Sequence, residues 1–370
     1  MTVKRTPRNE KAKRAYLIFL RDAKGRDEKS IDQVAAAIDR FDEYNRRRDF
    51  AKFHIEQARG FKAHLSARRN ARTGEPLSAS TVNSTLCTVK AFFVWLSGHE
   101  DYHRHVKQAD AEYFNPPDNL ARVATARRHK PCASLKQIRA VLDAMPTTTE
   151  IEWRDHALIA FTILTGARDR AIVSFRLKDI DLEHELLEQD ARHARTKGAK
   201  TFTTWFFPVG AEIQKIVVDW VTFLRTEKGF GPEDPIFPKT HVGNGPDLQF
   251  QVNGLERAPW ANANPVRAIF KEAFARAGLP YFNPHSFRNS LLQVAYDLKL
   301  DAEQFKAWSQ NLGHDDCLTT FSSYGTLPAH RQAEIIRGLA HPATAQAGGI
   351  SPDLLRQLAD QMERGSKANG

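Results

Sequence analysis

Cysteine and long apolar runs are both scarce in this sequence. The three cysteines, Cys87, Cys132 and Cys317, lie far apart and form no CxxC pair. They give no sign of a disulfide framework or a zinc site, and they fit a reducing cytoplasm. No stretch approaches about 18 consecutive apolar residues, which argues against a transmembrane helix. The charged N-terminal residues also lack the apolar segment of a secretory signal. We therefore expect a soluble protein without a membrane partner.

Negative charge is scarce in the N-terminal third. The formal net charge of the chain is +10, and residues 1–130 hold 27 Lys and Arg against 16 Asp and Glu, a net of +11. Residues 131–370 hold 27 and 28, a net of −1. Basic side chains that neutralise phosphates release counterions, so a polyanion is the natural partner of the N-terminal third. A basic surface that serves only solubility stays open as the alternative.

The N-terminal third divides into segments of different pattern. Residues 1–14 are polar and basic, and predict a short flexible arm. Apolar residues recur at helical spacing over residues 15–120, which predicts a helical domain. Its clearest helix is capped within Ser78-Ala79-Ser80-Thr81 and ends at Gly98. The basic and poorly periodic residues 121–132 are interpreted as a linker between domains.

Residues 133–340 combine helical and strand patterns and predict a second domain. Ser134 has the features of an N-cap for its first helix. Residues 186–188 and 201–207 have the composition of strands around a turn at residues 196–200. Further helical patterns cover residues 152–164, 211–225, 265–277, 285–298, 302–312 and 330–339.

A tail follows over residues 341–370. Ser351 and Pro352 suit the N-cap and first position of a helix over residues 351–364. The chain is therefore predicted to be mainly α, an α+β protein with a helical first domain and a small antiparallel β-sheet in its second domain.

The C-terminal half contains an ordered set of cations, imidazoles and one phenol. Its members are Arg168, Lys197, His285, Arg288, His314 and Tyr324. Attack on a DNA phosphate needs a nucleophile, cations on the non-bridging oxygens and an acid for the leaving 5′-oxygen. Arginine suits the non-bridging oxygens because its planar guanidinium group binds two oxygens and stays charged. A lysine can supply the proton for the leaving 5′-oxygen. The set suits breaking and remaking a phosphodiester bond without a metal.

Single members of this set have competitors or ordinary structural explanations. Arg168 follows Gly166, where the helix over residues 152–164 is predicted to end, with Arg170 nearby. Lys197 lies at the tip of the predicted hairpin, with Lys200 as the second candidate. Tyr324 is chosen among the seven tyrosines because it follows the other residues closely in a polar context. Nearby guanidinium groups would have to stabilise its phenolate.

The two histidines of the set lie beside predicted helix ends. His285 and Arg288 are three residues apart, so they share one face of a helix. Asn283-Pro284 marks the start of that helix, where backbone N–H groups favour anions. His314 follows Leu312-Gly313, where another helix stops. These side chains are therefore candidates for contact with one phosphate.

In this order the set resembles the catalytic pattern of the tyrosine recombinase (phage integrase) family. That pattern is Arg, Lys on a β-hairpin, His-x-x-Arg, a His or Trp after Leu-Gly, and Tyr. The surrounding residues are similar as well, in Leu-Thr-Gly-Ala-Arg (164–168), Leu-Lys-Asp-Ile-Asp (177–181), Pro-His-Ser-Phe-Arg (284–288) and Asn-Leu-Gly-His (311–314). Residues 80–96 look like part of that family's helical core-binding domain. The resemblance covers roughly residues 15–340.

The resemblance implies a fold and a mechanism. A helical core-binding domain and a mixed catalytic domain would form a C-shaped clamp on double-stranded DNA. Tyr324 would attack the scissile phosphate, forming a 3′-phosphotyrosyl link and releasing a 5′-hydroxyl. Lys197 would be the general acid, and His285 an acid/base and phosphate ligand. The phosphate would also be held by Arg168, Arg288 and His314. No cofactor or metal is needed, because the covalent intermediate keeps the bond energy.

The resemblance also implies partners and a location. Members of the family work as tetramers that join two duplexes through a Holliday junction. We expect a tetramer on two DNA sites, with accessory DNA-bending proteins as further partners, in the cytoplasm and on the bacterial nucleoid when bound. The tail helix over residues 351–364 would dock on a neighbouring subunit or pack on its own domain.

Two departures from the family pattern keep other hypotheses open. Ala171 stands where the family has an acidic residue, with Asp169 as a candidate substitute, and the stretch from His314 to Tyr324 is one residue longer than usual. These departures motivate a second hypothesis, a catalytically impaired DNA-binding protein. A third hypothesis is a type IB topoisomerase-like enzyme that relaxes DNA by the same chemistry. No pattern in the sequence indicates the target DNA site, or the choice between integration, excision and dimer resolution.

Overall fold

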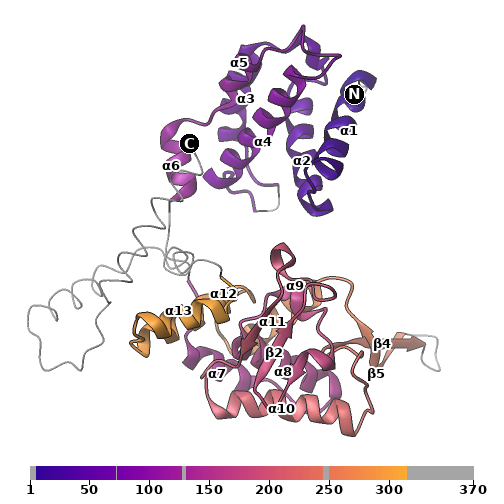
Figure 1. Ribbon diagram of the computed structural model, residues 1–370, viewed down its shortest axis with the longest axis vertical. Coiled ribbons are helices and arrows are strands. Elements are labelled where there is room, and N and C mark those ends of the chain that lie inside the picture. The colour runs from indigo at the N-terminus through magenta and orange to yellow at the C-terminus, as the bar shows by residue number, and fades with distance from the viewer. Residues whose placement is uncertain (1–5, 72, 127–130, 245–249, 315–370) are drawn as a thin grey trace, which may run out of the picture. The chain divides into compact units, whose positions relative to one another are not determined.

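The computed structural model describes residues 6–71, 73–126, 131–244 and 250–314. The chain divides into two compact units, Met1–Ala126 and Arg127–Gly370. Both units consist mainly of helices, and the β-sheets that are described belong to the second unit (Figure 1). Among the described helices, none has the length and apolar character that crossing a membrane requires.

The first unit is a helical bundle whose helices start at local caps. Its helices are α1 (Pro7–Asp22), α2 (Glu28–Tyr44), α3 (Ile55–Ala67), α4 (Ala79–Ser97), α5 (Gln108–Ala111) and α6 (Asp118–Thr125), with the 3₁₀ turns η1 (Phe50–Lys52) and η2 (Glu112–Phe114). The Asp27 carboxylate accepts the N–H of Ser30 and caps α2. Ser78 caps α4, and α4 ends at Gly98. The predicted helix in this region is therefore confirmed, with Ser78 as its cap.

An aromatic core holds α2, α3 and α4 together. The ring centroid of Phe41 in α2 lies 5.1 Å from that of Phe61 in α3 and 5.2 Å from that of Phe93 in α4. Phe114 of η2 also lies 5.2 Å from Phe41, and all four side chains are fully buried. Edge-to-face rings add to the stabilisation that burial provides. These four segments therefore pack as one body.

The prediction of a flexible arm over residues 1–14 is wrong from Pro7 onwards, where α1 begins. Asn9 is fully buried and donates to the Asp42 carboxylate at 2.8 Å. Lys13 is buried as well, and its ammonium group lies 3.0 Å from the same carboxylate. Buried polar groups are tolerated when they bond to one another. The polar sequence therefore marks a buried hydrogen-bond network between α1 and α2.

The linker expected over residues 121–132 begins later than predicted. Residues 121–125 belong to α6, which packs on α4. None of the residues of α6 is fully buried, and Leu120 packs against the core of the first unit from its edge. The poor periodicity of this segment therefore reflects a short surface helix.

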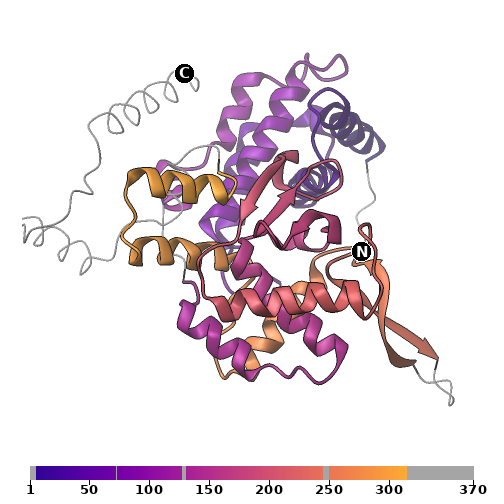
Figure 2. The same cartoon turned by 60° about the horizontal axis from the view of Figure 1, so that its bottom comes forward.

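The second unit places its helices around two small antiparallel sheets. The helices are α7 (Leu135–Ala144), α8 (Glu150–Thr165), α9 (Asp169–Ile172), α10 (Ala211–Thr226), α11 (Asn264–Arg276), α12 (Ser286–Asp297) and α13 (Ala302–Asn311), with the 3₁₀ turns η3 (Leu177–Asp179) and η4 (Lys197–Ala199). One sheet has the order β1 (Ile180–Asp181), β2 (Leu186–Gln189), β3 (Phe202–Trp205), and the other is the hairpin of β4 (Pro238–Asn244) and β5 (Phe250–Pro259). Figure 2 shows this hairpin projecting from the unit. The sequence patterns did not predict it.

Helix α8 buries ten of its 16 residues. Thr149 and Glu152 form a capping box at its start, and residues 157–165 are all buried. It packs on α10 and α12. The helix predicted over residues 152–164 is confirmed, and so is its end at Gly166. The cap predicted at Ser134 for α7 is confirmed as well.

Strands β2 and β3 flank a long loop. Their pairing ends where Gln189 faces Phe202, so residues 190–201 connect the two strands without pairing. The predicted strand pair is confirmed, although β3 ends at Trp205. The loop begins and ends on a sheet that packs on the core, so both ends of the loop are fixed.

Candidate active site

Arg168 follows the end of α8 by way of a left-handed glycine. Gly166 has a φ of 60°, and a Cβ atom there would lie 2.9 Å from the side chains of Leu291 and Leu312. Only glycine fits this turn without strain. Arg168 is then the N-cap residue of α9, with a half-buried side chain. Burial lowers the pKa of its guanidinium group, so an anion bound beside it would favour the charged form.

Arg288 lies in the first turn of α12, and its side chain is buried. Its Nη1 donates to the carbonyl of Gly166 at 2.7 Å. Its Nη2 donates to the carbonyl of Leu312 at 2.5 Å and lies 2.9 Å from Nε2 of His314. Arg288 therefore connects the ends of α8 and α13, and it holds His314 next to the turn that carries Arg168.

The guanidinium groups of Arg168 and Arg288 are close enough to repel each other. Burial, and after it the charge of Arg168, lower the pKa of Arg288 to about 9. No carboxylate among the described residues contributes to the pKa of either group. Two adjacent, partly desolvated cations without a counterion are costly until an anion binds both. The two non-bridging oxygens of a phosphodiester match the donors of guanidinium groups.

Gly313 determines where His314 lies. Its φ is 67°, and a Cβ atom there would lie 2.5 Å from the ring of Phe202. The chain leaves α13 at this point, and the N–H of His314 donates to the carbonyl of Ser309 at 3.2 Å. Because a guanidinium group only donates, Nε2 of His314 accepts from Arg288, and the neutral ring carries its proton on Nδ1. Arg288 thus orients the imidazole.

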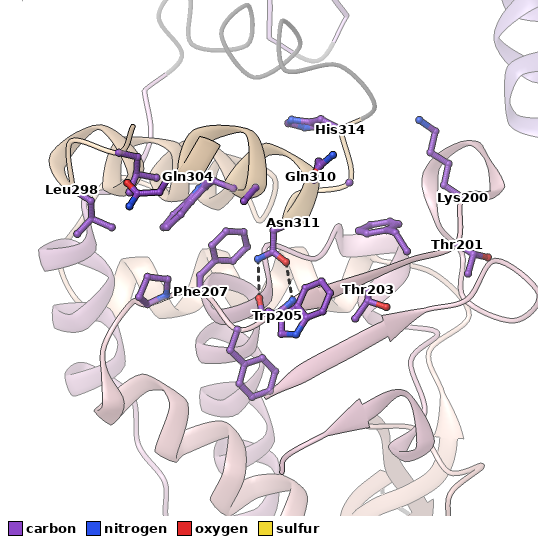
Figure 3. Close-up of a pocket in the computed structure, with 17 residues that line it drawn as sticks. Lys200, Thr201, Thr203, Trp205, Phe207, Leu298, Gln304, Gln310, Asn311 and His314 are labelled. Atoms are coloured by element: carbon purple, nitrogen blue, oxygen red, sulfur yellow. Dashed lines mark hydrogen bonds between the residues drawn. The ribbon is translucent and has the colours of Figure 1, made fainter. Parts of the chain in front are cut away.

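Lys197 begins the turn η4 in the loop between β2 and β3, as the sequence predicts. Gly198 and Ala199 have φ values of 71° and 52°, so the chain reverses direction directly after Lys197. Lys200, the competing candidate, is half-buried and lines a groove together with His314 (Figure 3). The same loop therefore carries both candidate acids.

The other predicted residues are placed as follows. His285 is the N-cap residue of α12 and is exposed, whereas Arg288 is buried three residues later. Tyr324 lies outside the described residues, and so do the helices predicted over residues 330–339 and 351–364. The structure thus brings together Arg168, Arg288 and His314 from separate parts of the second unit.

The carboxylate of Asp169, the candidate substitute for an acidic residue at position 171, is engaged with α11. It accepts two hydrogen bonds from Arg267 of α11, at 2.8 and 2.7 Å. Ala171 is buried in the core with 1% exposure. The short helix α9 therefore uses its carboxylate to bind α11, and only a methyl group occupies position 171.

A groove of about 1110 Å³ lies between β3 and α13. Trp205, Phe207 and Trp308 contribute to its apolar lining. The Asn311 side chain accepts from the N–H of Trp205 at 2.7 Å and donates to the carbonyl of Trp205 at 2.9 Å (Figure 3). Asn311 thereby ties the end of α13, and the histidine after it, to the sheet. Sequence reasoning missed Asn311, because a side chain that pairs with a strand backbone leaves no pattern in the sequence.

Solved structures of recombinases and integrases share this fold. A lambda integrase dimer bound to a COC′ core site is 12% identical, with a TM-score of 0.58 over 85% of this chain and 94% of that chain. XerH recombinase bound to palindromic difH substrate is 15% identical, with a TM-score of 0.57 over 84% and 80%. The Tn1549 transposon integrase in complex with transposon right end DNA is 14% identical, with a TM-score of 0.54 over 89% and 99%.

The chain was compared with curated protein sequences and with models of protein families. No curated protein sequence matches the chain. The model of the phage integrase family matches residues 134–329, which is more than half of the 370 residues. This span includes Arg168, Arg288 and His314 with the elements that position them. The chain belongs to the phage integrase family, the site-specific tyrosine recombinases.

Proposed function

We propose that this recombinase cleaves and rejoins double-stranded DNA through a 3′-phosphotyrosyl intermediate. The observation that carries the proposal is the convergence of Arg168 and Arg288, with His314 hydrogen-bonded to Arg288 and no carboxylate among the described residues to neutralise the pair. Such a pair suits the non-bridging oxygens of a scissile phosphate.

The reaction would proceed by in-line exchange at phosphorus. The phenol oxygen of Tyr324 forms a bond to phosphorus as the bond to the 5′-oxygen breaks. The phenol proton passes to His285, the proposed acid/base and phosphate ligand, and Lys197 gives its proton to the leaving 5′-oxygen. The phosphate is held by Arg168, Arg288 and His314. Rejoining reverses these steps when a 5′-hydroxyl attacks, so the covalent link conserves the bond energy.

The charge that develops in the transition state explains why several cations are useful. The pentacoordinate phosphorus carries more negative charge than the ground-state diester. Donors that are already in place around it stabilise that charge by on the order of 3 kcal/mol each. Arg288 is held by the carbonyls of Gly166 and Leu312, so it needs little reorganisation before it acts.

The first unit would supply most of the electrostatic affinity for DNA. The first unit, residues 1–126, holds 24 Lys and Arg against 16 Asp and Glu, a net charge of +8, and the helical body over residues 15–120 would be the core-binding domain. We further propose a tetramer on two DNA sites, assisted by DNA-bending proteins and acting on the bacterial nucleoid. Affinity would then fall steeply as salt rises, because counterions are released on binding.

A trapping experiment tests the proposal. Nicked duplexes tiled across the DNA that flanks the gene are incubated with the protein, and covalent adducts are detected after denaturation. A nick beside the scissile phosphate lets the short 5′ fragment leave, so the phosphotyrosyl link cannot be reversed. Wild type should form an adduct with one duplex, and Tyr324→Phe should form none.

Other outcomes favour the alternatives. Specific binding with no adduct for either protein would identify a DNA-binding protein without catalysis. Relaxation of a supercoiled plasmid that lacks the trapped site would identify a topoisomerase-like enzyme. An equal adduct yield from Tyr324→Phe would show that another residue is the nucleophile.

A further inference from the structure

The loop that carries Lys197 is held by a histidine–carboxylate contact. Nε2 of His193 lies 2.7 Å from Oδ1 of Asp179. Asp179 ends η3, directly before β1, and has only 3% exposure. Its second oxygen accepts the N–H of Arg176 at 2.8 Å. One side of the loop is therefore attached to a buried acceptor that the neighbouring backbone holds in place.

Two more contacts fix the residues after His193. Ala194 is buried in the core with 4% exposure. Arg195 donates from its N–H to Ser174 Oγ at 2.9 Å and from Nη1 to the carbonyl of Ala261 at 2.7 Å. The chain is thus attached to the second unit up to Arg195. Lys197 follows two residues later, at the start of the left-handed turn.

This arrangement bears on catalysis because proton transfer depends on position. A general acid must come within hydrogen-bond reach of the atom that it protonates, and a misplacement of about 1 Å can slow a reaction about 100-fold. No strand pairing holds residues 190–201. Contacts other than strand pairing, such as those of His193 and Arg195, must therefore determine where its lysine lies.

We propose that His193, held by Asp179, is a positioning residue that places Lys197 for proton transfer to the leaving 5′-oxygen. The inference rests on the proposed role of Lys197 in phosphodiester cleavage. His193 itself touches neither the substrate nor the reacting atoms in this scheme. It acts by keeping the segment before Lys197 against η3.

A sulfur substitution in the DNA separates positioning of the acid from a general structural role. The nicked duplex is made with sulfur in place of the bridging 5′-oxygen at the scissile phosphate. A thiol has a pKa of about 8.5, so the thiolate leaves without a proton, whereas an alkoxide needs one. A defect in the general acid therefore disappears on the sulfur substrate, and a defect in folding or DNA binding persists.

Single-turnover cleavage is measured for variants on both substrates. His193→Ala should be about 10-fold slower than wild type on the oxygen substrate and within about twofold on the sulfur substrate. His193→Gln, whose amide can still donate to Asp179, should be close to wild type on both. Asp179→Asn removes the charge without opening a cavity and should show the pattern of His193→Ala more weakly. If His193→Ala does not fold, Asp179→Asn is the variant that tests the inference.

The chain offers a matched control. His184 makes the same kind of contact, from Nδ1 to Asp181 at 2.8 Å, but its side chain is 68% exposed. His184→Ala should change neither rate. Thermal unfolding of each variant shows whether it is folded at the assay temperature.

The outcomes distinguish the inference from the function on which it rests. If Lys197→Ala cleaves the oxygen substrate slowly and the sulfur substrate at the wild-type rate, Lys197 is the general acid. In that case, if His193→Ala cleaves at the wild-type rate, or is equally slow on both substrates, only the positioning role of His193 is overturned. If Lys197→Ala is not restored by sulfur, or if Lys200→Ala shows that pattern instead, the assignment of Lys197 is wrong and the inference falls with it.

Discussion

Replacing Arg288 with methionine should affect cleavage far more than stability. Methionine retains an unbranched apolar stem but removes the charge and the donors. The loss of donors leaves the carbonyls of Gly166 and Leu312 without their present partner, which costs about 1–3 kcal/mol for each buried group. Removing the buried cation acts in the opposite direction. A pKa lowered from 12.5 to about 9 corresponds to about 5 kcal/mol, at about 1.4 kcal/mol per unit.

The lost partners cost about 2–6 kcal/mol together and removal of the buried charge returns about 5 kcal/mol, so the free energy of unfolding of Arg288→Met should change by no more than about 3 kcal/mol. In the proposed mechanism Arg288 is a phosphate ligand in the transition state, so cleavage should slow by about 10²–10³-fold. Urea denaturation at pH 7 measures the first quantity, and single-turnover cleavage of the nicked duplex measures the second. Arg276→Met on α11 is the control, because Arg276 is exposed and its only described ion pair is a surface pair with Glu272.

Two results would refute this reasoning. A loss of stability beyond about 4 kcal/mol would mean that the hydrogen bonds of Arg288 outweigh the cost of burying its charge. Cleavage at the wild-type rate would mean that the guanidinium group does not contact the phosphate in the transition state.

Three further predictions follow from the structure. Gly313→Ala should lower the free energy of unfolding by about 1–3 kcal/mol and slow cleavage, because the added Cβ atom would lie 2.5 Å from the ring of Phe202. Denaturation and cleavage assays measure the two effects. A melting temperature equal to that of the wild type would contradict the prediction. The DNA affinity of Tyr324→Phe, which lacks the proposed nucleophile, should stay constant below pH 9 and weaken above it. A bound phosphate raises the lowered pKa of Arg288 above its value of about 9 in the free protein. The contribution of Arg288 to DNA affinity is therefore complete below pH 9 and is lost as the pH rises through the pKa of the DNA-bound form. Binding titrations from pH 7 to about 10.5 measure this affinity, and a rise in affinity over this range would contradict the prediction. Asn9→Ala should lower the free energy of unfolding by about 1–3 kcal/mol, since Asn9 is fully buried and bonded to Asp42. An unchanged value in urea denaturation would show that this buried hydrogen bond does not stabilise the first unit.

Signals within one helical turn were sufficient to predict several elements. Ser78 and Ser134 cap α4 and α7 through N–H groups three residues later, and Gly166 ends α8 because a left-handed residue is needed there. The order of the candidate catalytic residues is also a property of the sequence. Such features depend on neighbours along the chain, so a sequence can encode them directly.

Other features depend on contacts between distant residues. The polar sequence of residues 1–14 predicted a flexible, exposed arm, but the side chain of Asn9 is hydrogen-bonded to Asp42, 33 residues away. The contact that places Arg288 on the Gly166 carbonyl spans 122 residues. His193 gave no signal as a partner of Asp179, because a lone histidine in a loop is compatible with many surroundings. The sequence thus determined which groups are present and where single helices begin and end. Tertiary packing decided which of those groups meet, because desolvation and hydrogen bonding act on neighbours in space.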